Sequence, residues 1–305
     1  MEILTMLSEF TTPDSLYYWE TWIDDNFFLL AMFVFAIELV RYAFKRRISW
    51  RLIGDSTTNF VTLGFLFLMV FIVGLAYVGA FLFAYENWSL THLPLTGWTV
   101  ISCLILADLA YYWEHRFLHS NGFAWGTHSV HHSSPFFNIS VAYRFGPLDW
   151  FFPFFFHLPL VLLGFHPFLV LMCETIVQVF QTLLHTETVK RFPRPIEAVF
   201  NTPSHHRVHH AANKRYLDKN YAGILIIWDR IFGTFAREDD KVKYGIYPAV
   251  NSVNPIKVLF HGYWKLAQQI WNAPSWAYRC QLLVRSPHWA WEQSQKRRRS
   301  DANPS

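Results

Sequence analysis

Long uncharged apolar stretches alternate with short polar segments in the first two thirds of the chain. The longest, residues 60–83, contains no charged side chain, and about 20 apolar residues are enough for a helix to cross a bilayer. A stretch at 27–40 contains one charge, Glu38, and a further stretch covers 96–113. The pattern predicts three membrane-spanning helices, near residues 27–40, 59–84 and 96–113.

A fourth apolar region, residues 147–187, is divided by a Gly-Phe-His-Pro break at 164–167. Each half has about 17 to 19 residues, which is marginal for crossing a core ~30 Å thick at a rise of 1.5 Å per residue. We therefore expect a helical hairpin that enters and leaves the membrane on the same side.

Beyond residue 190 the sequence becomes amphipathic and richer in charge, with turn signals at Arg194-Pro195, Thr202-Pro203 and Gly223. This change predicts a helical cap against one face of the membrane, followed by a basic tail that is mostly disordered. The expected divisions are 1–114 for the N-terminal spans, 115–146 for a first histidine-rich region, 147–187 for the hairpin, 188–290 for the cap and 291–305 for the tail.

Composition agrees with a membrane protein. The chain has 52% hydrophobic, 19% aromatic and 16% charged residues, whereas soluble domains carry nearer a quarter charged. The fold class expected is an all-α integral membrane protein with about four transmembrane helices, including the hairpin, and a histidine-rich cytoplasmic helical cap. The small net charge of +4 is not interleaved with stacking aromatics, so nucleic-acid binding is a poor fit. The N-terminus lacks a cleavable signal pattern, so the first span is expected to act as an uncleaved anchor.

The distribution of basic residues predicts the orientation. Five Lys and Arg residues at 41–51 follow the first span, whereas the loop after the second span has none. Because short loops rich in Lys and Arg stay in the cytoplasm, the third span should deliver residue 115 to that side, and the hairpin should return the chain there. We expect an active site on the cytoplasmic face of a bacterial inner membrane or the endoplasmic reticulum.

Histidines gather at these cytoplasmic exits in HRFLH, HSVHH and HRVHH. Residues three or four apart on a helix share a face, so each motif should present two or three imidazoles together. No single metal takes eight protein nitrogens, which points to two ions. The candidate ligands are His115, His119, His128, His131, His132, His206, His209 and His210, with His185 as a ninth.

Imidazole suits iron, zinc and copper alike. Eight or nine neutral ligands around two ions leave open positions, unlike structural zinc with its four ligands, and this favours an open di-iron centre that activates oxygen. The HExxH motif of zinc proteases is absent, and no ExxH lies within the clusters. The competing interpretation is a solvated basic face or a pH sensor.

Several polar residues are weaker candidates. Asp108 is expected to orient a histidine ring from its position seven residues before His115, the alternative being a structural pair with a neighbouring Tyr or Arg. Asp218 and Asp229 are similar candidates. For Gln181 two interpretations remain open, a weak role near the metal and simple packing. His205 is expected to lie outside the ligand set.

The three motifs resemble the HxxxH, HxxHH and HxxHH boxes of the fatty acid hydroxylase and sterol desaturase superfamily of membrane di-iron enzymes. Neighbouring segments such as FNISVAYR and LLHTE are most similar to the alkylglycerol monooxygenase branch. The resemblance covers residues 30–240. It implies two iron ions (Fe2+/Fe3+) held by the boxed histidines, use of O2, and His185 as a match to an additional histidine of the hairpin.

The resemblance thus implies a lipid hydroxylase that acts on a fatty acyl, sterol or alkylglycerol ether substrate. No GxGxxG or CxxCH motif occurs, so electrons should come from outside, from tetrahydrobiopterin or from a cytochrome- or ferredoxin-type protein. A desaturase using the same oxidant remains open, and so does a non-catalytic histidine-rich metal-binding membrane protein.

Overall fold

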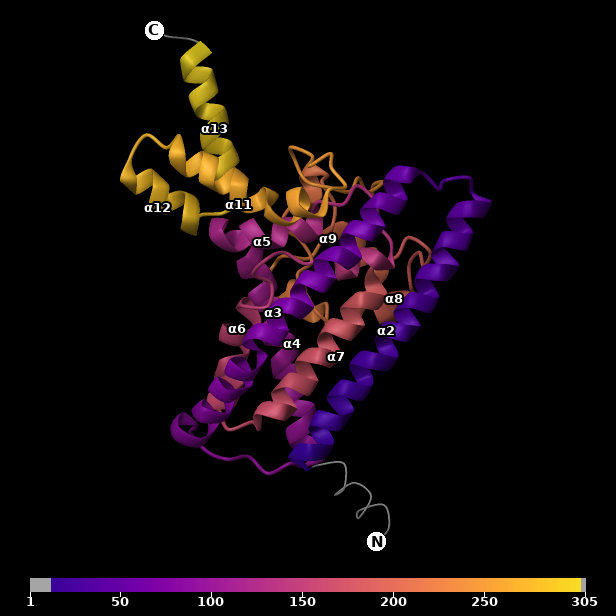
Figure 1. Cartoon of the computed structure of the whole chain (residues 1–305), viewed down its shortest axis with the longest axis vertical. Coiled ribbons are helices and arrows are strands. Elements are labelled where there is room, and N and C mark those ends of the chain that lie inside the picture. The colour runs from indigo at the N-terminus through magenta and orange to yellow at the C-terminus, as the bar shows by residue number, and fades with distance from the viewer. Residues whose placement is uncertain (1–11, 303–305) are drawn as a thin grey trace.

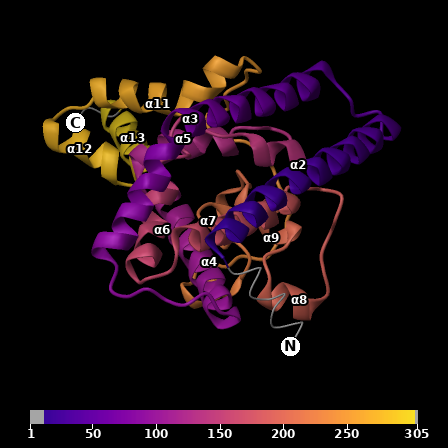
Figure 2. The same cartoon turned by 60° about the horizontal axis from the view of Figure 1, so that its bottom comes forward.

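The computed structural model describes residues 12–302, and every regular element within that range is helical apart from two isolated β-bridges (Figure 1). Five helices form a bundle, and the shorter helices gather at one of its ends (Figures 1 and 2). Three helices are long and apolar enough to cross a membrane, namely α2 (Pro13–Phe44), α3 (Trp50–Trp88) and α7 (Pro167–Leu184).

The first helix begins well before the predicted span. Thr12 and Ser15 form a reciprocal capping box, and the helix then runs through the aromatic lead-in. Leu16 of this segment is buried, and Tyr17 contacts Phe168 at the start of α7. These contacts with α7 explain why the helix extends beyond its most apolar stretch.

The third predicted span is α4 (Gly97–Ser120), which is central and more polar than the three candidate spans. Small side chains at Cys103, Ala107 and Cys173 allow α4 and α7 to approach closely, as in other membrane helix pairs. The core that they form with Phe81 and Val161 fills the end of the bundle away from the short helices.

The predicted hairpin consists of α6 (Phe152–Leu162) and α7. With 11 residues, α6 is too short to cross a bilayer at about 1.5 Å per residue. The two helices are separated at Gly164, whose φ of +101° suits glycine and whose missing side chain admits the Thr91 carbonyl. Among the described residues three helices are candidate spans, so the expected count of about four is not confirmed.

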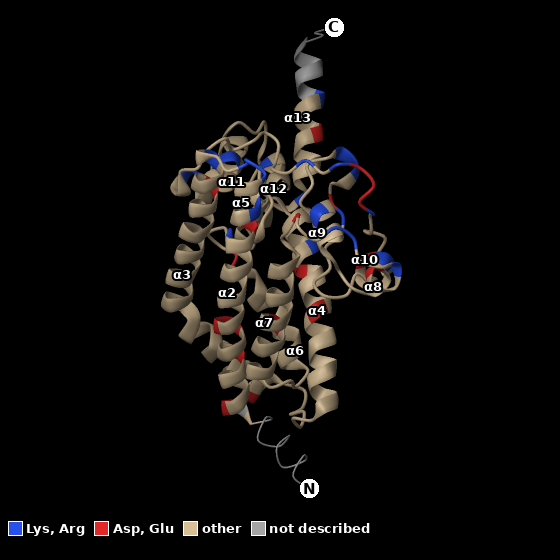
Figure 3. Ribbon diagram, turned by 90° about the vertical axis from the view of Figure 1, so that its right-hand side faces the viewer, with Lys and Arg blue, Asp and Glu red and all other residues tan. Residues whose placement is uncertain are grey.

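The remaining helices gather at and beside one end of the bundle (Figures 1 and 3). Gly262 packs directly on the Gly126 carbonyl, so α11 lies flat on α5. The segment expected to be a disordered tail is helical as far as Ala302. Ser286 accepts from the Trp289 N–H at the start of this helix, and His288 pairs with Glu292 in its first turns. The elements are α5 (Gly122–His132), α8 (Arg194–Val199), α9 (Pro203–His209), α10 (Ile227–Ile231), α11 (Pro255–Trp271), α12 (Trp276–Val284), α13 (Pro287–Ala302) and the 3₁₀ turns Ile139–Tyr143 and Lys214–Tyr216.

Charge is distributed unevenly along the bundle. Lys and Arg residues lie in the half of the molecule that holds α5, α9 and α11, including the segments near α8 and α10 beside the bundle (Figure 3). Between residues 52 and 115, and again between 145 and 189, the sequence contains neither. The outer faces of the long helices are apolar instead, with Phe71 and Leu75 of α3 85% and 91% exposed.

Candidate metal centre

All nine histidines predicted as ligands come together where α4, α5, α7 and α9 meet. Their ring nitrogens form two groups, and the ligand atoms within each group lie within 4.8 Å of one another. Group 1 consists of His115, His119, His128, His132 and His209, and group 2 of His131, His185, His206 and His210.

The two HxxHH motifs each contribute to both groups. Residues four apart lie on one helical face, so His128 and His132 enter group 1 together, while His206 and His210 enter group 2. The histidine between each pair crosses to the other group. Helices α5 and α9 therefore hold the two groups side by side.

In group 2 the ring nitrogens face one another in an arrangement that calls for a cation. Nδ1 of His131 lies 3.3 Å from the Arg144 carbonyl oxygen, and Nδ1 of His185 lies 2.9 Å from the Gln181 carbonyl oxygen. A carbonyl can only accept, so each Nδ1 carries the proton and each Nε2 presents a lone pair in the neutral ring. The two Nε2 atoms are 3.2 Å apart, and a positive ion between such lone pairs would remove their repulsion.

In group 1, too, backbone carbonyls accept hydrogen bonds from Nδ1 atoms. Nδ1 of His115 donates to the Tyr221 carbonyl at 3.0 Å, and Nδ1 of His209 donates to the Lys219 carbonyl at 3.0 Å. Nε2 of His119 is buried without a hydrogen-bond partner. Backbone carbonyls that accept from Nδ1 fix the ring orientation in metal sites, so both groups fit a metal ion.

Burial keeps these rings neutral, which is the protonation state that binds metals. Desolvation lowers the pKa of His115 to about 4 and that of His185 to about 3. The pKa values of His132 and His210 are also lowered well below 6.5, by burial first and then by neighbouring imidazoles. The solvated basic face considered from the sequence does not match this burial.

Asp108 does not have the partner predicted for it. Its carboxylate accepts hydrogen bonds from the backbone N–H groups of Ile224 (2.5 Å) and Leu225 (3.0 Å) and from Trp228 Nε1 (2.8 Å), and from no histidine among the described residues. The backbone donors follow Gly223, where the chain passes close to α4. Asp108 therefore fixes the loop that approaches the histidines, and the expected contact with a ring is wrong.

Asp229 stabilises the same loop closer to the histidines. Its two oxygens accept from the N–H groups of Tyr221 and Ala222, at 2.8 Å each, and Thr234 donates to it at 2.6 Å. Because the Tyr221 carbonyl receives Nδ1 of His115, Asp229 positions that ring through one peptide unit. Gln181 acts on the loop from α7, donating to the carbonyls of Ala222 and Gly223.

The other candidates take different places. Asp218 lies 3.9 Å from Nδ1 of His119, close enough for an electrostatic contact. His205 belongs to neither group, and its Nδ1 lies 3.4 Å from the Thr202 hydroxyl.

The sequence interpretation missed Arg144, which is 1% exposed and bonds Asp55, Asn59 and the Val130 carbonyl. Its own carbonyl receives His131, so this buried ion pair supports α5 from α3. An arginine within an otherwise uncharged stretch after the second motif was the available signal.

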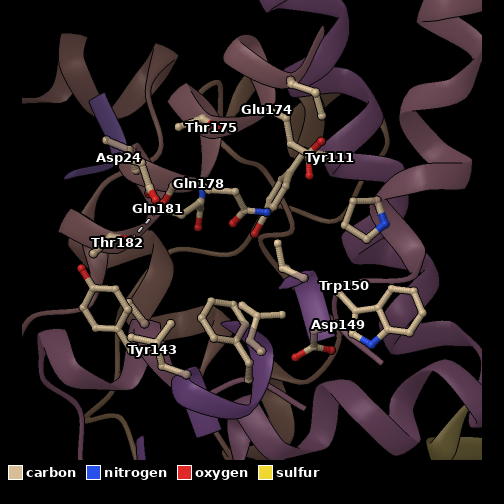
Figure 4. A pocket seen from close by; sticks show the side chains of 18 of the residues that line it. Asp24, Tyr111, Tyr143, Asp149, Trp150, Glu174, Thr175, Gln178, Gln181 and Thr182 are labelled. Carbon is tan, nitrogen blue, oxygen red and sulfur yellow. Dashed lines mark hydrogen bonds between the residues drawn. The ribbon is translucent and has the colours of Figure 1, made fainter. Parts of the chain in front are cut away.

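A cavity of about 670 Å³ opens from the histidines into the bundle, between α2, α3, α4 and α7. His115, His128, His131, His185 and His206 form part of its wall, and Val70, Val73 and other apolar side chains line it further away. Figure 4 shows polar side chains around it, including Tyr111, Glu174 and Gln178. Its volume lies in the range of small-molecule sites.

A bundle of apolar helices with two buried histidine groups at one end defines a membrane-helical protein with a candidate metal centre. Residues 100–234, which include all nine histidines, match the family model described as fatty acid hydroxylase. This region is therefore a fatty acid hydroxylase domain.

Similar proteins agree with this assignment. The chain is 38% identical to alkylglycerol monooxygenase of Homo sapiens over 211 residues, which is 69% of this chain and 47% of that protein. It is 39% identical to alkylglycerol monooxygenase of Danio rerio over 213 residues, 70% and 47% of the two chains. Ornithine lipid hydroxylase OlsE of Rhizobium tropici is 33% identical over 137 residues, 45% and 41% of the two chains. The chain spans about half the length or less of these relatives, and no solved structure matches it.

Proposed function

We propose that this protein is a membrane-bound di-iron oxygenase that hydroxylates an unactivated C–H bond of a lipid. The observation that carries the proposal is the pair of histidine groups, each with Nε2 atoms converging at about 3 Å and Nδ1 atoms held by carbonyls, at the end of an apolar cavity. The relatives' names, monooxygenase and lipid hydroxylase, support the reaction class.

Each group would hold one ion. Five imidazoles in group 1 and four in group 2 give nine neutral ligands. Imidazole does not choose among iron, zinc and copper, so iron is proposed from the family assignment. When bound, the two irons would supply O2 activation and the oxidation of the C–H bond.

The chain's own residues would hold the ions, orient the histidine rings and shield the site from water. Asp229 and the carbonyls of Lys219 and Tyr221 fix rings of group 1. The carbonyls of Arg144 and Gln181 do the same for group 2. The apolar walls of the cavity would exclude bulk water and align a lipid chain with the histidines.

The charge distribution supports a cytoplasmic site. The Lys and Arg residues gather in the half of the molecule that holds the histidines, as expected if that end faces the cytoplasm (Figure 3). The membrane would be a bacterial inner membrane or the endoplasmic reticulum. Electrons would come from tetrahydrobiopterin or from a cytochrome- or ferredoxin-type protein.

Membranes that contain the protein, incubated with lipid extract, a reductant and ¹⁸O₂, test the reaction. A lipid product that carries one ¹⁸O atom supports hydroxylation, and the His131→Ala variant should form none. A product that lacks two hydrogens and gains no oxygen would identify the alternative, a desaturase. Unchanged lipids with an iron-loaded protein would contradict both and favour a non-catalytic metal-binding protein.

A further inference from the structure

The cavity contains polar side chains that neither hold the histidines nor pair with one another. Tyr111 and Glu114 of α4 and Glu174 and Gln178 of α7 line the cavity, and within the described residues none of these four side chains makes a hydrogen bond. Glu114 is only 5% exposed, and its Oε2 atom is buried without a partner. Unpaired polar groups inside a membrane bundle are costly and mark functional sites.

The nearest polar group does not satisfy the two carboxyls. Nδ1 of His157 lies 4.0 Å from an oxygen of Glu114 and 3.9 Å from one of Glu174. However, that nitrogen already donates to the Pro153 carbonyl at 3.0 Å. Both carboxyls therefore retain hydrogen-bonding capacity for a molecule in the cavity.

These residues lie beside the metal centre. The ring of Tyr111 is 5.3 Å from that of His115, centroid to centroid, and Glu114 is the residue before His115. Gln178 precedes His185 by two turns on the same side of α7, and both line the cavity. A group bound by this set would be near group 1.

The charge of the cavity limits which head groups fit. Among the described lining residues there are six carboxylic side chains and no Lys or Arg. An anionic head group at these residues would meet carboxylic side chains and no cationic side chain, and the cost of placing an unpaired charge in a low dielectric is high. A hydroxyl can donate to a carboxyl oxygen whether or not that carboxyl is protonated.

We propose that Tyr111, Glu114, Glu174 and Gln178 form a polar subsite that binds the hydroxyl-bearing, uncharged head group of the lipid substrate and rejects lipids with anionic head groups. The apolar chain then extends along α3 past Val70 and Val73, and the C–H bonds nearest the head group lie next to group 1. The inference rests on the proposed function for the identity of the site.

Equilibrium binding to the purified, metal-loaded protein in nanodiscs tests the subsite without turnover. The probes are a glycerol monohexadecyl ether and hexadecyl phosphate, which share a chain and differ in head-group charge. The wild-type protein should bind the neutral probe at least about tenfold more tightly, as expected for paired against unpaired polar groups. Equal affinities, or a preference for the phosphate, would overturn the proposal.

Three variants assign the effect to the subsite. Glu174→Leu should weaken binding of the neutral probe about tenfold, whereas Glu174→Gln, which keeps an acceptor, should stay within about threefold of the wild type. Tyr111→Phe keeps the ring beside His115, removes only the hydroxyl, and should also weaken binding of the neutral probe. This variant tests the subsite even if Glu174→Leu fails to fold. The control is Glu86→Leu, an exposed carboxylate on α3 outside the cavity.

If every folded subsite variant binds the neutral probe with wild-type affinity, the inference is wrong. Iron content and ¹⁸O incorporation are measured on the same preparations. A failure of the subsite is therefore distinguishable from a failure of the oxygenase assignment.

Discussion

His131 and His185 are 54 residues apart in the chain, and their Nε2 atoms lie 3.2 Å from each other. Both rings carry the Nδ1 proton, because each Nδ1 meets a backbone carbonyl. The contact is therefore not a hydrogen bond between neutral imidazoles. The arrangement fits a cation placed between the two rings.

Removing the Asp229 carboxylate should weaken metal binding at group 1. Asp229→Ala frees the N–H groups of Tyr221 and Ala222, and the Tyr221 carbonyl then holds His115 less firmly. Loss of such an outer partner typically costs about 10- to 100-fold in metal affinity. Iron retained after dialysis against graded chelator measures this, with the exposed Asp240→Ala as control. Equal retention in both variants would argue against the positioning role.

Asp108 should matter more for stability than for metal affinity. In Asp108→Ala, three donors, from Ile224, Leu225 and Trp228, lose their acceptor in a buried place. Each unsatisfied group costs about 1–3 kcal/mol. We expect a clearly lower Tm by thermal unfolding in detergent, while exposed Asp239→Ala leaves Tm within a degree or two. If Asp108→Ala instead keeps the wild-type Tm but loses iron, Asp108 acts on a histidine, as the sequence predicted.

The metal-free protein should lose stability as the pH falls from about 6.5 to about 4. The folded-state pKa values of His115 and His185 are about 4 and about 3, below the ordinary value of 6.5. In this window the unfolded chain takes up protons that the folded chain refuses, so lower pH favours unfolding. Tm measured against pH should fall across the window, and less steeply in a His115→Gln, His185→Gln double variant. A Tm independent of pH between 6.5 and 4 would mean that these rings are not buried and neutral.

The buried Arg144 should be essential for folding of the centre. Arg144→Met removes the partner of Asp55 and leaves that carboxylate, 2% exposed, without its countercharge. Removing one member of a buried pair costs about 3–5 kcal/mol. Urea unfolding in micelles should show this loss, and a double variant Arg144→Met, Asp55→Leu should recover part of it. Exposed Arg215→Met, which also loses an ion pair, should change little.

The local patterns were sufficient to find the apolar helices and the nine histidines, because hydropathy and helical spacing depend on neighbouring residues. The division of each HxxHH motif between two groups depends on how α5 and α9 meet, which spacing alone does not reveal. Asp108 was assigned a wrong partner for the same reason. Its true partners, residues 224–228, are more than 110 positions away and donate mostly from the backbone, which leaves no trace in side-chain type.

The hydropathy pattern also did not predict where the helices begin and end. The α2 helix starts at Pro13 because of a capping box and contacts with α7, and α4 lies among neighbouring helices although it carries charges. The polar residues of the cavity were missed because each is unremarkable in sequence. Only the meeting of α4 and α7 brings them together.

In the proposed function, each histidine group holds one iron ion. Metal analysis of protein purified from iron-supplemented cells should give two irons per chain. His119→Ala in group 1 and His185→Ala in group 2 should each lower the iron content, and His92→Ala, outside both groups, should leave two. One ion or none in the wild-type protein, or two ions in both group variants, would contradict the account.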